Sequence, residues 1–193
     1  MAGDVLGGQG PFESSKVIYV KVSFAEMKKL SKEISKKILS TGKKPDAIVY
    51  IERGGMVIAR LLCDYLDVKN VYGIQASYYT DIGRRADTVK AREFRIDEIK
   101  TLGMNILLVD DIADTGKTLK FLHGKLASAG IHAQAATLVY KRGSIIKPDF
   151  YGTEVEGNVW IVFDYEEEES RRSFSKSGNK AGAEFLDKNF PEG

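Results

Sequence analysis

Two adjacent carboxylates, Asp110 and Asp111, precede a short polar turn that runs from Asp114 to Thr118. Carboxylates in such a position can hold hydroxyl groups, either directly or through a divalent cation. The turn offers backbone N–H groups, Thr hydroxyls and the positive end of a helix dipole, all of which favour a bound phosphate. The stretch 105–119 therefore predicts a site for a phosphorylated ligand.

The elements on either side of this stretch place it at the edge of a sheet. Residues 106–109 form an unbroken apolar run, which is typical of a strand buried on both faces of a parallel sheet. Beyond Thr118 the apolar spacing becomes helical. Because the carboxyl ends of the strands face the ligand crevice in an open α/β sheet, polar residues can serve chemistry here without disrupting the core.

Two other interpretations of the stretch are weaker. The run Gly116-Lys117-Thr118 is like the end of a P-loop, but that motif requires a glycine five residues before Gly116, where this chain has Asp111. An ordinary ATPase loop is therefore rejected. A purely structural role, in which both Asp residues only cap and solvate the strand end, leaves the phosphate-shaped turn behind them unexplained.

A second strand, turn and helix occur earlier in the chain. Residues 46–51 predict a strand, the turn carries Arg53, Gly54 and Gly55, and residues 56–66 predict an apolar helix. The glycines let the backbone approach a ligand while the helix start supplies N–H groups. A plain tight turn is the alternative explanation for this glycine pair.

Length and composition bound the class of protein. With 193 residues and 43% hydrophobic content, the chain is long enough for one domain with a sizeable core. Its 29 basic and 27 acidic residues nearly balance, which argues against a nucleic-acid partner. A single cysteine, Cys63, excludes an internal disulfide, and no apolar run or N-terminal pattern indicates a membrane span or a secretion signal. We expect a cytoplasmic protein.

The apolar strand, the acidic pair and the x-x-D-T-G-x-T run resemble the phosphoribosyl diphosphate (PRPP) signature of the type I phosphoribosyltransferases. The resemblance covers residues 45–165 and implies a doubly wound parallel sheet of the α/β class that binds PRPP with Mg²⁺. It implies that Asp110 and Asp111 hold the ribose hydroxyls and the metal, and that Asp114 is the catalytic base. The residues implied to bind PRPP and its 5-phosphate are Asp110, Asp111, Ala113, Asp114, Thr115, Gly116, Lys117 and Thr118.

In this family the double-glycine loop binds pyrophosphate, which assigns that role to Arg53, Gly54 and Gly55. Many members carry a non-proline cis peptide in this loop.

A cationic segment, residues 77–97, loses apolar periodicity. Composition alone favours an exposed hairpin with a solvated basic face. In the family, however, a mobile catalytic loop begins with a Ser-Tyr pair, here Ser77 and Tyr78. The resemblance therefore implies a lid whose Arg84 and Arg85 also contact pyrophosphate.

The purine base is assigned to the C-terminal third of the chain. In the 6-oxopurine phosphoribosyltransferases, a strand-end Lys donates to the base O6 and an aromatic residue stacks on the ring. Lys141, which is followed by a K-P-D-F turn from Lys147, matches that lysine, and Trp160 matches the aromatic residue. Ile161 is included in this base pocket. Asp164 departs from the family pattern. Its carboxylate could accept from an exocyclic amino group, orient a magnesium-bound water or face solvent, so adenine stays open as the base.

The expected organisation is a flexible tail over residues 1–14, a phosphoribosyltransferase domain over 15–170 and a polar extension over 171–193. Residues 15–40 and 141–170 are expected to add a small hood that carries the base pocket. The implied partners are PRPP, a purine base, pyrophosphate and a nucleoside monophosphate, without a membrane or nucleic acid, in a homodimer. A non-catalytic PRPP or nucleotide sensor is a third possibility, which ranks below the enzymes because Asp114 and the basic segment are both present.

Overall fold

The computed structural model describes residues 17–79, 88–91, 95–103 and 105–191. Six α-helices and one 3-10 helix lie in this part of the chain: α1 Phe24–Ser40, α2 Gly55–Leu66, α3 Ile96–Leu102, α4 Lys117–Ser128, η1 Asp164–Glu166, α5 Glu167–Ser177 and α6 Lys180–Asn189. The strands are β1 Ile18–Val22, β2 Ala47–Glu52, β3 Asn70–Tyr79, β4 Thr88–Ala91, β5 Asn105–Ala113, β6 His132–Lys141, β7 Phe150–Val155 and β8 Val159–Phe163.

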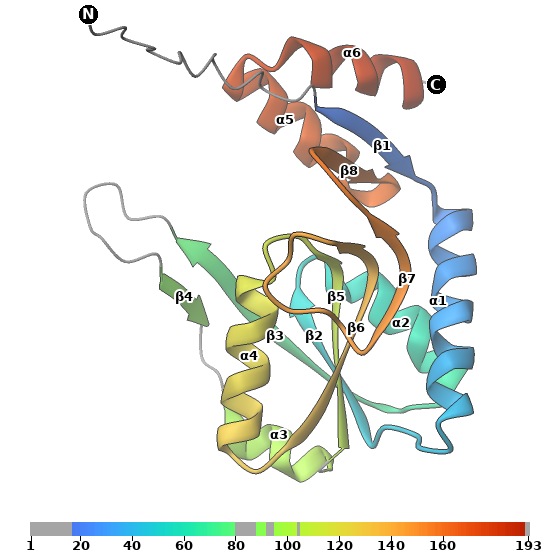
Figure 1. Cartoon of the computed structure of the whole chain (residues 1–193), viewed down its shortest axis with the longest axis vertical. Helices are drawn as coiled ribbons and strands as arrows, with labels where there is room; N and C mark the ends of the chain where they lie inside the picture. Colours follow the sequence, from blue (N-terminus) through green and yellow to red (C-terminus); the bar gives the residue numbers. More distant parts are fainter. Residues whose placement is uncertain (1–16, 80–87, 92–94, 104, 192–193) are drawn as a thin grey trace, which may run out of the picture.

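The main sheet has six strands in the order β4-β3-β2-β5-β6-β7 (Figure 1). Every neighbouring pair is parallel except β3 and β4. The central strands β2 and β5 are therefore adjacent, and both turns that the sequence singled out leave the same edge of the sheet. The predicted α/β class and parallel sheet are confirmed.

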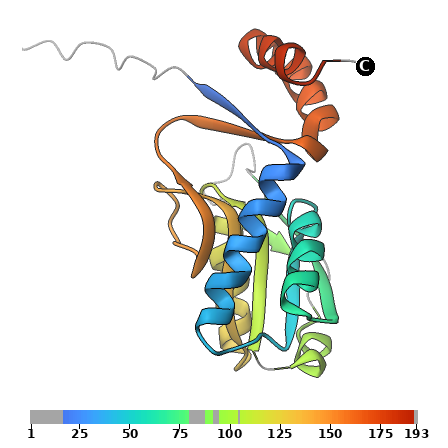
Figure 2. The same cartoon turned by 90° about the vertical axis from the view of Figure 1, so that its right-hand side faces the viewer.

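Two apolar layers hold the helices against the two faces of this sheet. Side chains from α1 and α2, such as Ile34 and Leu62, pack on one face against Leu107 of β5. Helices α3 and α4 cover the other face, where Leu122 packs near Leu108. Figure 2 shows α1 and α2 side by side on their face. Neighbouring residues of β5 thus enter opposite cores, as expected for a strand buried on both faces.

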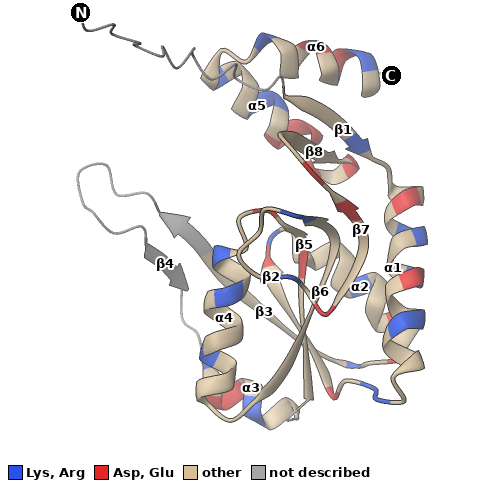
Figure 3. Ribbon diagram, viewed as in Figure 1, with Lys and Arg blue, Asp and Glu red and all other residues tan. Residues whose placement is uncertain are grey.

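The first helix begins with a capping box at Ser23. The Ser23 hydroxyl accepts a hydrogen bond from the Glu26 backbone N–H at 3.2 Å, and the Glu26 carboxylate accepts from the Ser23 backbone N–H at 2.8 Å, which completes a capping box. Thr41 is the C-cap residue. Figure 3 shows basic and acidic residues interspersed along the ribbon of α1, and most of these charged residues are exposed.

A small second layer, which we call the hood, lies over the carboxyl edge of the main sheet (Figure 1). It consists of the parallel pair β1 and β8 together with α5 and α6. Val162, Phe174, Leu186 and Phe190 form its own apolar core. The two ends of the described chain therefore meet in one unit.

The hood differs from the expected one in its boundaries. Helix α1 packs on the main sheet and β7 is an edge strand of that sheet, so both lie outside the hood. The expected boundary between residues 170 and 171 falls inside α5. Phe174 and Leu186, which lie beyond that boundary, fill the hood core, because a two-stranded sheet cannot bury its own apolar face. The expected tail, residues 1–14, lies outside the described residues.

None of the helices in the described part of the chain is long and apolar enough to span a membrane.

Candidate functional site

The acidic pair lies at the carboxyl end of β5, directly beneath the hood. Asp111 is buried, and its Oδ2 lies 3.0 Å from the Tyr165 hydroxyl. The Oδ1 atom of Asp110 accepts the backbone N–H of Asp111 at 3.0 Å. Burial raises the pKa of both carboxyls, and repulsion from Asp111 raises the pKa of Asp110 further. Two carboxylates held this close would gain from a cation or from hydroxyl donors.

The double-glycine loop lies against this pair. A Cβ added at Gly54 would overlap the Asp111 carboxylate, and one added at Gly55 would lie 2.6 Å from the Val109 carbonyl oxygen. The Tyr165 hydroxyl also lies 3.2 Å from the Gly54 carbonyl oxygen. Only glycines allow this contact between the loop and β5. The peptide bond between Glu52 and Arg53, just before the two glycines, is cis, as the resemblance implied.

The turn before α4 is shaped to receive an anion. Gly116 has a positive φ of 74°, and a Cβ there would overlap the Ser144 hydroxyl. Within the described residues, the backbone N–H groups of Thr115, Gly116 and Thr118 donate to no protein acceptor. They therefore stay available at the N-terminus of a twelve-residue helix, where the helix dipole also favours negative charge.

Ala113 differs from the other residues expected to bind PRPP. Its side chain is only 1% exposed and packs in the core on the α4 face of the sheet. The methyl group faces the core, so a contact of Ala113 with PRPP could come only from its backbone, and this assignment stays a prediction.

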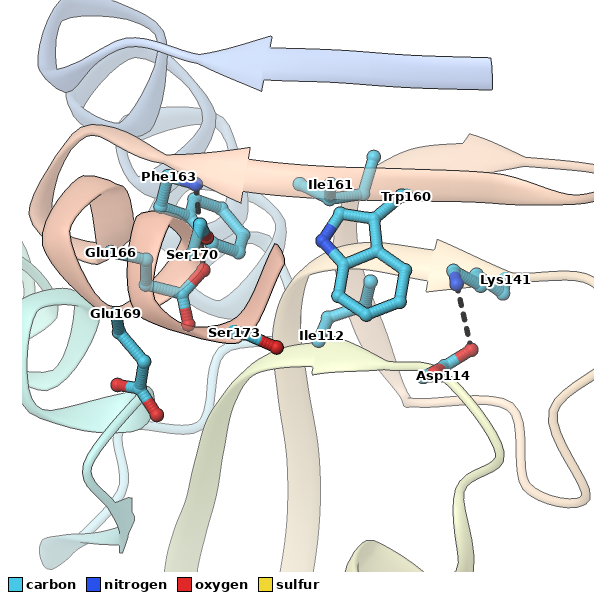
Figure 4. Close-up of a pocket in the computed structure, with 10 residues that line it drawn as sticks. All are labelled: Ile112, Asp114, Lys141, Trp160, Ile161, Phe163, Glu166, Glu169, Ser170 and Ser173. Atoms are coloured by element: carbon cyan, nitrogen blue, oxygen red, sulfur yellow. Dashed lines mark hydrogen bonds and ion pairs between the residues drawn. The ribbon is translucent and has the colours of Figure 1, made fainter. Parts of the chain in front are cut away.

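A pocket of about 270 Å³ lies between the sheet and the hood (Figure 4). Asp114 and Lys141, from the ends of β5 and β6, form an ion pair of 2.8 Å on one side of it. Trp160 of β8 extends from the hood into the pocket, and 45% of its surface is exposed. The centroids of the Trp160 and Phe174 rings lie 5.4 Å apart. An ammonium, a carboxylate and a flat apolar ring thus face one cavity of a size that suits a small planar molecule.

Sequence reasoning missed one wall of this pocket, which comes from α5 and the residue before it. Glu166, Glu169, Ser170 and Ser173 all line the pocket (Figure 4). Their spacing of three and four residues places them on one helix face. That spacing is the signal that could have found them. Glu166, Glu169 and Ser170 lie in the segment 141–170 that was expected to form the hood, and Ser173 lies in the expected polar extension.

Glu166 and Glu169 also extend toward the double-glycine loop. Both oxygens of Glu169 lie 2.8 Å from Nη2 of Arg53. One oxygen of Glu166 accepts the backbone N–H of Phe163 at 3.4 Å. Burial and repulsion from Asp111 raise the pKa of Glu166 to about 7. A second open pocket, lined by Arg53, Gly54, Tyr165, Glu166 and Glu169, continues the site on this side.

The structure brings together three groups that the sequence analysis assigned separately: the acidic pair with its phosphate turn, the double-glycine loop, and the pocket with Lys141, Trp160 and Ile161. Asp164 does not join them. Its Oδ2 accepts the backbone N–H of Phe24 at 2.7 Å, and its Oδ1 pairs with Lys21 at 3.3 Å. A carboxylate held at the start of α1 by two donors is a structural link between hood and helix, so its assignment to the base is corrected.

The expected lid is only partly described. The backbone of Ser77 and Tyr78 lies in β3, where they pair with Lys90 and Val89 of the antiparallel strand β4. Arg84 and Arg85 lie outside the described residues.

Magnesium is the cofactor that the resemblance implied. The described residues contain no group of three or more side chains arranged to hold a metal ion. Mg²⁺ commonly takes one or two protein carboxylates and completes its octahedron with phosphate oxygens and water. The crowded pair Asp110 and Asp111 therefore fits a metal that arrives together with a diphosphate.

Comparison with known proteins agrees with this geometry. The phosphoribosyl transferase domain family matches residues 23–170. A xanthine-guanine phosphoribosyltransferase of Cereibacter sphaeroides is 33% identical over 131 residues, which are 65% of this chain and 74% of the relative. A protein of the same name from Idiomarina loihiensis is 26% identical over 75% of this chain and 85% of the relative.

Among solved structures, the Helicobacter pylori xanthine-guanine-hypoxanthine phosphoribosyltransferase is similar, with a TM-score of 0.64 and 26% identity. The match covers 80% of this chain and 97% of that one. The residues matched by the family include the acidic pair, the phosphate turn and the double-glycine loop. This chain therefore belongs to the phosphoribosyl transferase domain family.

Proposed function

We propose that this protein is a purine phosphoribosyltransferase that uses 6-oxopurines. It transfers ribose 5-phosphate from PRPP to N9 of the base and releases pyrophosphate. The observation that carries the proposal is the pocket under the hood, where the Lys141–Asp114 ion pair and the exposed Trp160 lie together. Two further pockets share residues with it: one includes the double-glycine loop, and the other includes Thr115 and Lys117 of the phosphate turn. The purine names of the relatives support the same substrate class.

The phosphorylated sugar is held by three neighbouring parts of the sheet edge. The backbone amides of Thr115 and Gly116, which donate to no acceptor in the described part of the chain, bind the 5-phosphate together with the Thr hydroxyls. Asp110 and Asp111 bind the ribose hydroxyls, and they would also hold Mg²⁺, which when bound would balance charge on the departing pyrophosphate. Arg53 and the loop glycines face the pyrophosphate.

Transfer breaks the bond between the anomeric carbon and pyrophosphate and forms a bond from that carbon to N9. Positive charge builds on the sugar as pyrophosphate leaves, and the fixed carboxylates beneath it stabilise that charge. Lys141 has donors only, so it binds the carbonyl O6. Asp114, 2.8 Å from Lys141, takes the proton that N7 loses as N9 attacks.

Adenine loses the observation that motivated it. The Asp164 carboxylate is held by Lys21 and the start of α1. The pocket presents an ammonium instead, which can donate to a carbonyl oxygen but cannot accept from an exocyclic amino group. Within the proposal the protein is also a Mg²⁺-dependent, cytoplasmic homodimer, in keeping with the resemblance.

A panel of five free bases tests the function. The protein is incubated with PRPP and Mg²⁺ and with adenine, guanine, hypoxanthine, xanthine or orotate, and release of pyrophosphate and formation of nucleotide are followed. We expect nucleotide from 6-oxopurines and none after Mg²⁺ is chelated. Binding of PRPP without turnover of any base would instead favour a nucleotide sensor.

A further inference from the structure

The α5 wall of the base pocket is acidic and lies apart from the lysine. In Figure 4 the Trp160 indole lies between Lys141 on one side and Glu166 on the other. A purine that stacks on this indole with O6 at Lys141 directs the rest of its six-membered ring toward α5. The atoms of that ring edge are N1 and the substituent on C2, which is where 6-oxopurines differ from one another.

We infer that Glu166 is a specificity-determining residue that selects guanine over xanthine by accepting hydrogen bonds from N1–H and the 2-amino group. The inference rests on the proposed function and names the preferred base. A carboxylate only accepts hydrogen bonds, and guanine presents two adjacent donors on this edge. Xanthine presents a carbonyl oxygen at C2, which a carboxylate repels. Hypoxanthine has no substituent there and keeps only the N1–H donor.

Glu166 suits this role better than the other acid of the wall. Glu169 is 55% exposed at its side chain, and Arg53 already binds both of its oxygens. Glu166 is partly buried, and the Phe163 backbone N–H holds one of its oxygens, which limits the directions in which the carboxylate can point. Hydrogen bonds to a charged group that is partly removed from water are stronger than those at an exposed surface.

Nearby hydroxyls complete the same wall. Ser170 is 9% exposed and Ser173 lies one turn further along α5, and both line the pocket. A hydroxyl can donate or accept, so these residues fit any of the three bases. The charge of Glu166 is therefore the feature of the wall that distinguishes an amino group from a carbonyl.

The test compares bases in the full-length protein and in Glu166→Gln. At pH 8, with saturating PRPP and Mg²⁺, we expect the wild-type kcat/KM for guanine to exceed that for xanthine by roughly tenfold or more, the worth of one hydrogen bond to a charged group. In Glu166→Gln the amide can donate to a carbonyl, so this ratio should fall at least roughly tenfold. Glu168→Gln is the matched control, because Glu168 pairs with Arg172 outside the pocket, and should leave the ratio unchanged.

Several results of this experiment would overturn either the inference about Glu166 or the proposed function. A wild-type protein that uses xanthine as well as guanine overturns the inference without any variant, even if Glu166→Gln does not fold. An unchanged ratio in a folded Glu166→Gln protein, or a change confined to the KM for PRPP, assigns Glu166 to the pyrophosphate side and also overturns it. Absence of turnover with every base overturns the proposed function itself, which separates the two failures.

Discussion

In the proposed function, the charged side chains of Asp114 and Lys141 divide the recognition of one base. The ammonium lies 2.8 Å from the carboxylate, on the side of the pocket where a purine would place O6 and N7. The lysine has only donors and the ionised aspartate only acceptors, so the pair can bind a carbonyl and a ring N–H at the same time. The ion pair keeps each group oriented before the base enters.

Asp114→Asn should lose most turnover while PRPP still binds. An amide has nearly the shape of the carboxylate but cannot take the N7 proton, and a positioned general base contributes roughly 10²–10⁴ in rate. The measurement is kcat with the best base, together with PRPP affinity from calorimetry. Asp67→Asn is the control, because that exposed side chain lies at the far end of α2. Near-normal turnover in Asp114→Asn would refute its role as base.

Contacts between elements, at the next scale, hold the site together. The double-glycine loop, the end of β5 and η1 meet where Tyr165 lies within hydrogen-bond distance of both Asp111 and Gly54. Because Phe163 and Tyr165 also stack at 5.4 Å, this contact extends into the main core. The position of the acidic pair therefore depends on the hood as well as on the sheet.

Gly54→Ala should impair both folding and activity. The added methyl group would overlap the buried Asp111 carboxylate, and forcing such a group into a packed site costs roughly 1–3 kcal/mol. Displacing Asp111 should also lower kcat. Gly124→Ala is the matched control, because a Cβ there meets nothing within 4 Å on α4 and should stabilise the protein by roughly 0.5–1 kcal/mol. Equal stability changes in the two variants, measured by urea unfolding, would contradict this.

A second contact between elements joins α5 to the double-glycine loop. Glu169 binds Arg53 through both carboxylate oxygens, so it competes with an incoming pyrophosphate for that guanidinium.

Glu169→Gln should therefore lower the KM for PRPP by a few-fold, since an exposed ion pair of this kind is worth at most about 1 kcal/mol. The KM is measured at constant guanine. Glu168→Gln, on the same helix and paired with Arg172, should behave as the wild type. A raised KM in Glu169→Gln would show that this carboxylate assists PRPP binding instead.

For the molecule as a whole, the site couples stability to pH. The hood brings Glu166 toward the acids of β5, and burial with repulsion from Asp111 raises its pKa from 4.5 to about 7. The folded protein therefore binds the proton more tightly than the unfolded chain does.

The free energy of unfolding should therefore fall as pH rises from about 4.5 to 7. Below pH 4.5 the carboxyl is protonated in both states, and above 7 the folded state bears the full cost of its charge. Glu166→Gln removes this cost, so it should gain roughly 1–3 kcal/mol relative to the wild type between pH 5 and pH 8. Urea unfolding at both pH values measures the difference. Parallel wild-type and variant curves would show that the carboxyl is solvated.

Much of the site follows from patterns that are local in the sequence. The capping box at Ser23, the buried strand before Asp110 and the two glycine turns each depend on residues within a few positions of one another. The order of strands and helices then predicts a parallel sheet, which confines both turns to its carboxyl edge. Lys141 and Trp160 were found through the resemblance, because neither residue type indicates a base by itself.

The remaining features depend on contacts between distant segments. Asp164 and Glu166 are two residues apart in an acidic run, yet one caps α1 and the other lines the base pocket. The edge strand β7 carries a glycine and polar residues, and only pairing with β6 makes it a strand.

The sequence alone thus determined the acidic strand end and the two glycine turns, because these groups come from single strand–turn–helix units whose geometry is set by nearby residues. Only the tertiary structure decided which acids line the pocket under the hood, because that depends on how the C-terminal helices pack against a strand from the other end of the chain. Packing of the hood buries one carboxylate in the pocket and turns its neighbour toward Lys21, and no spacing along the chain encodes that choice.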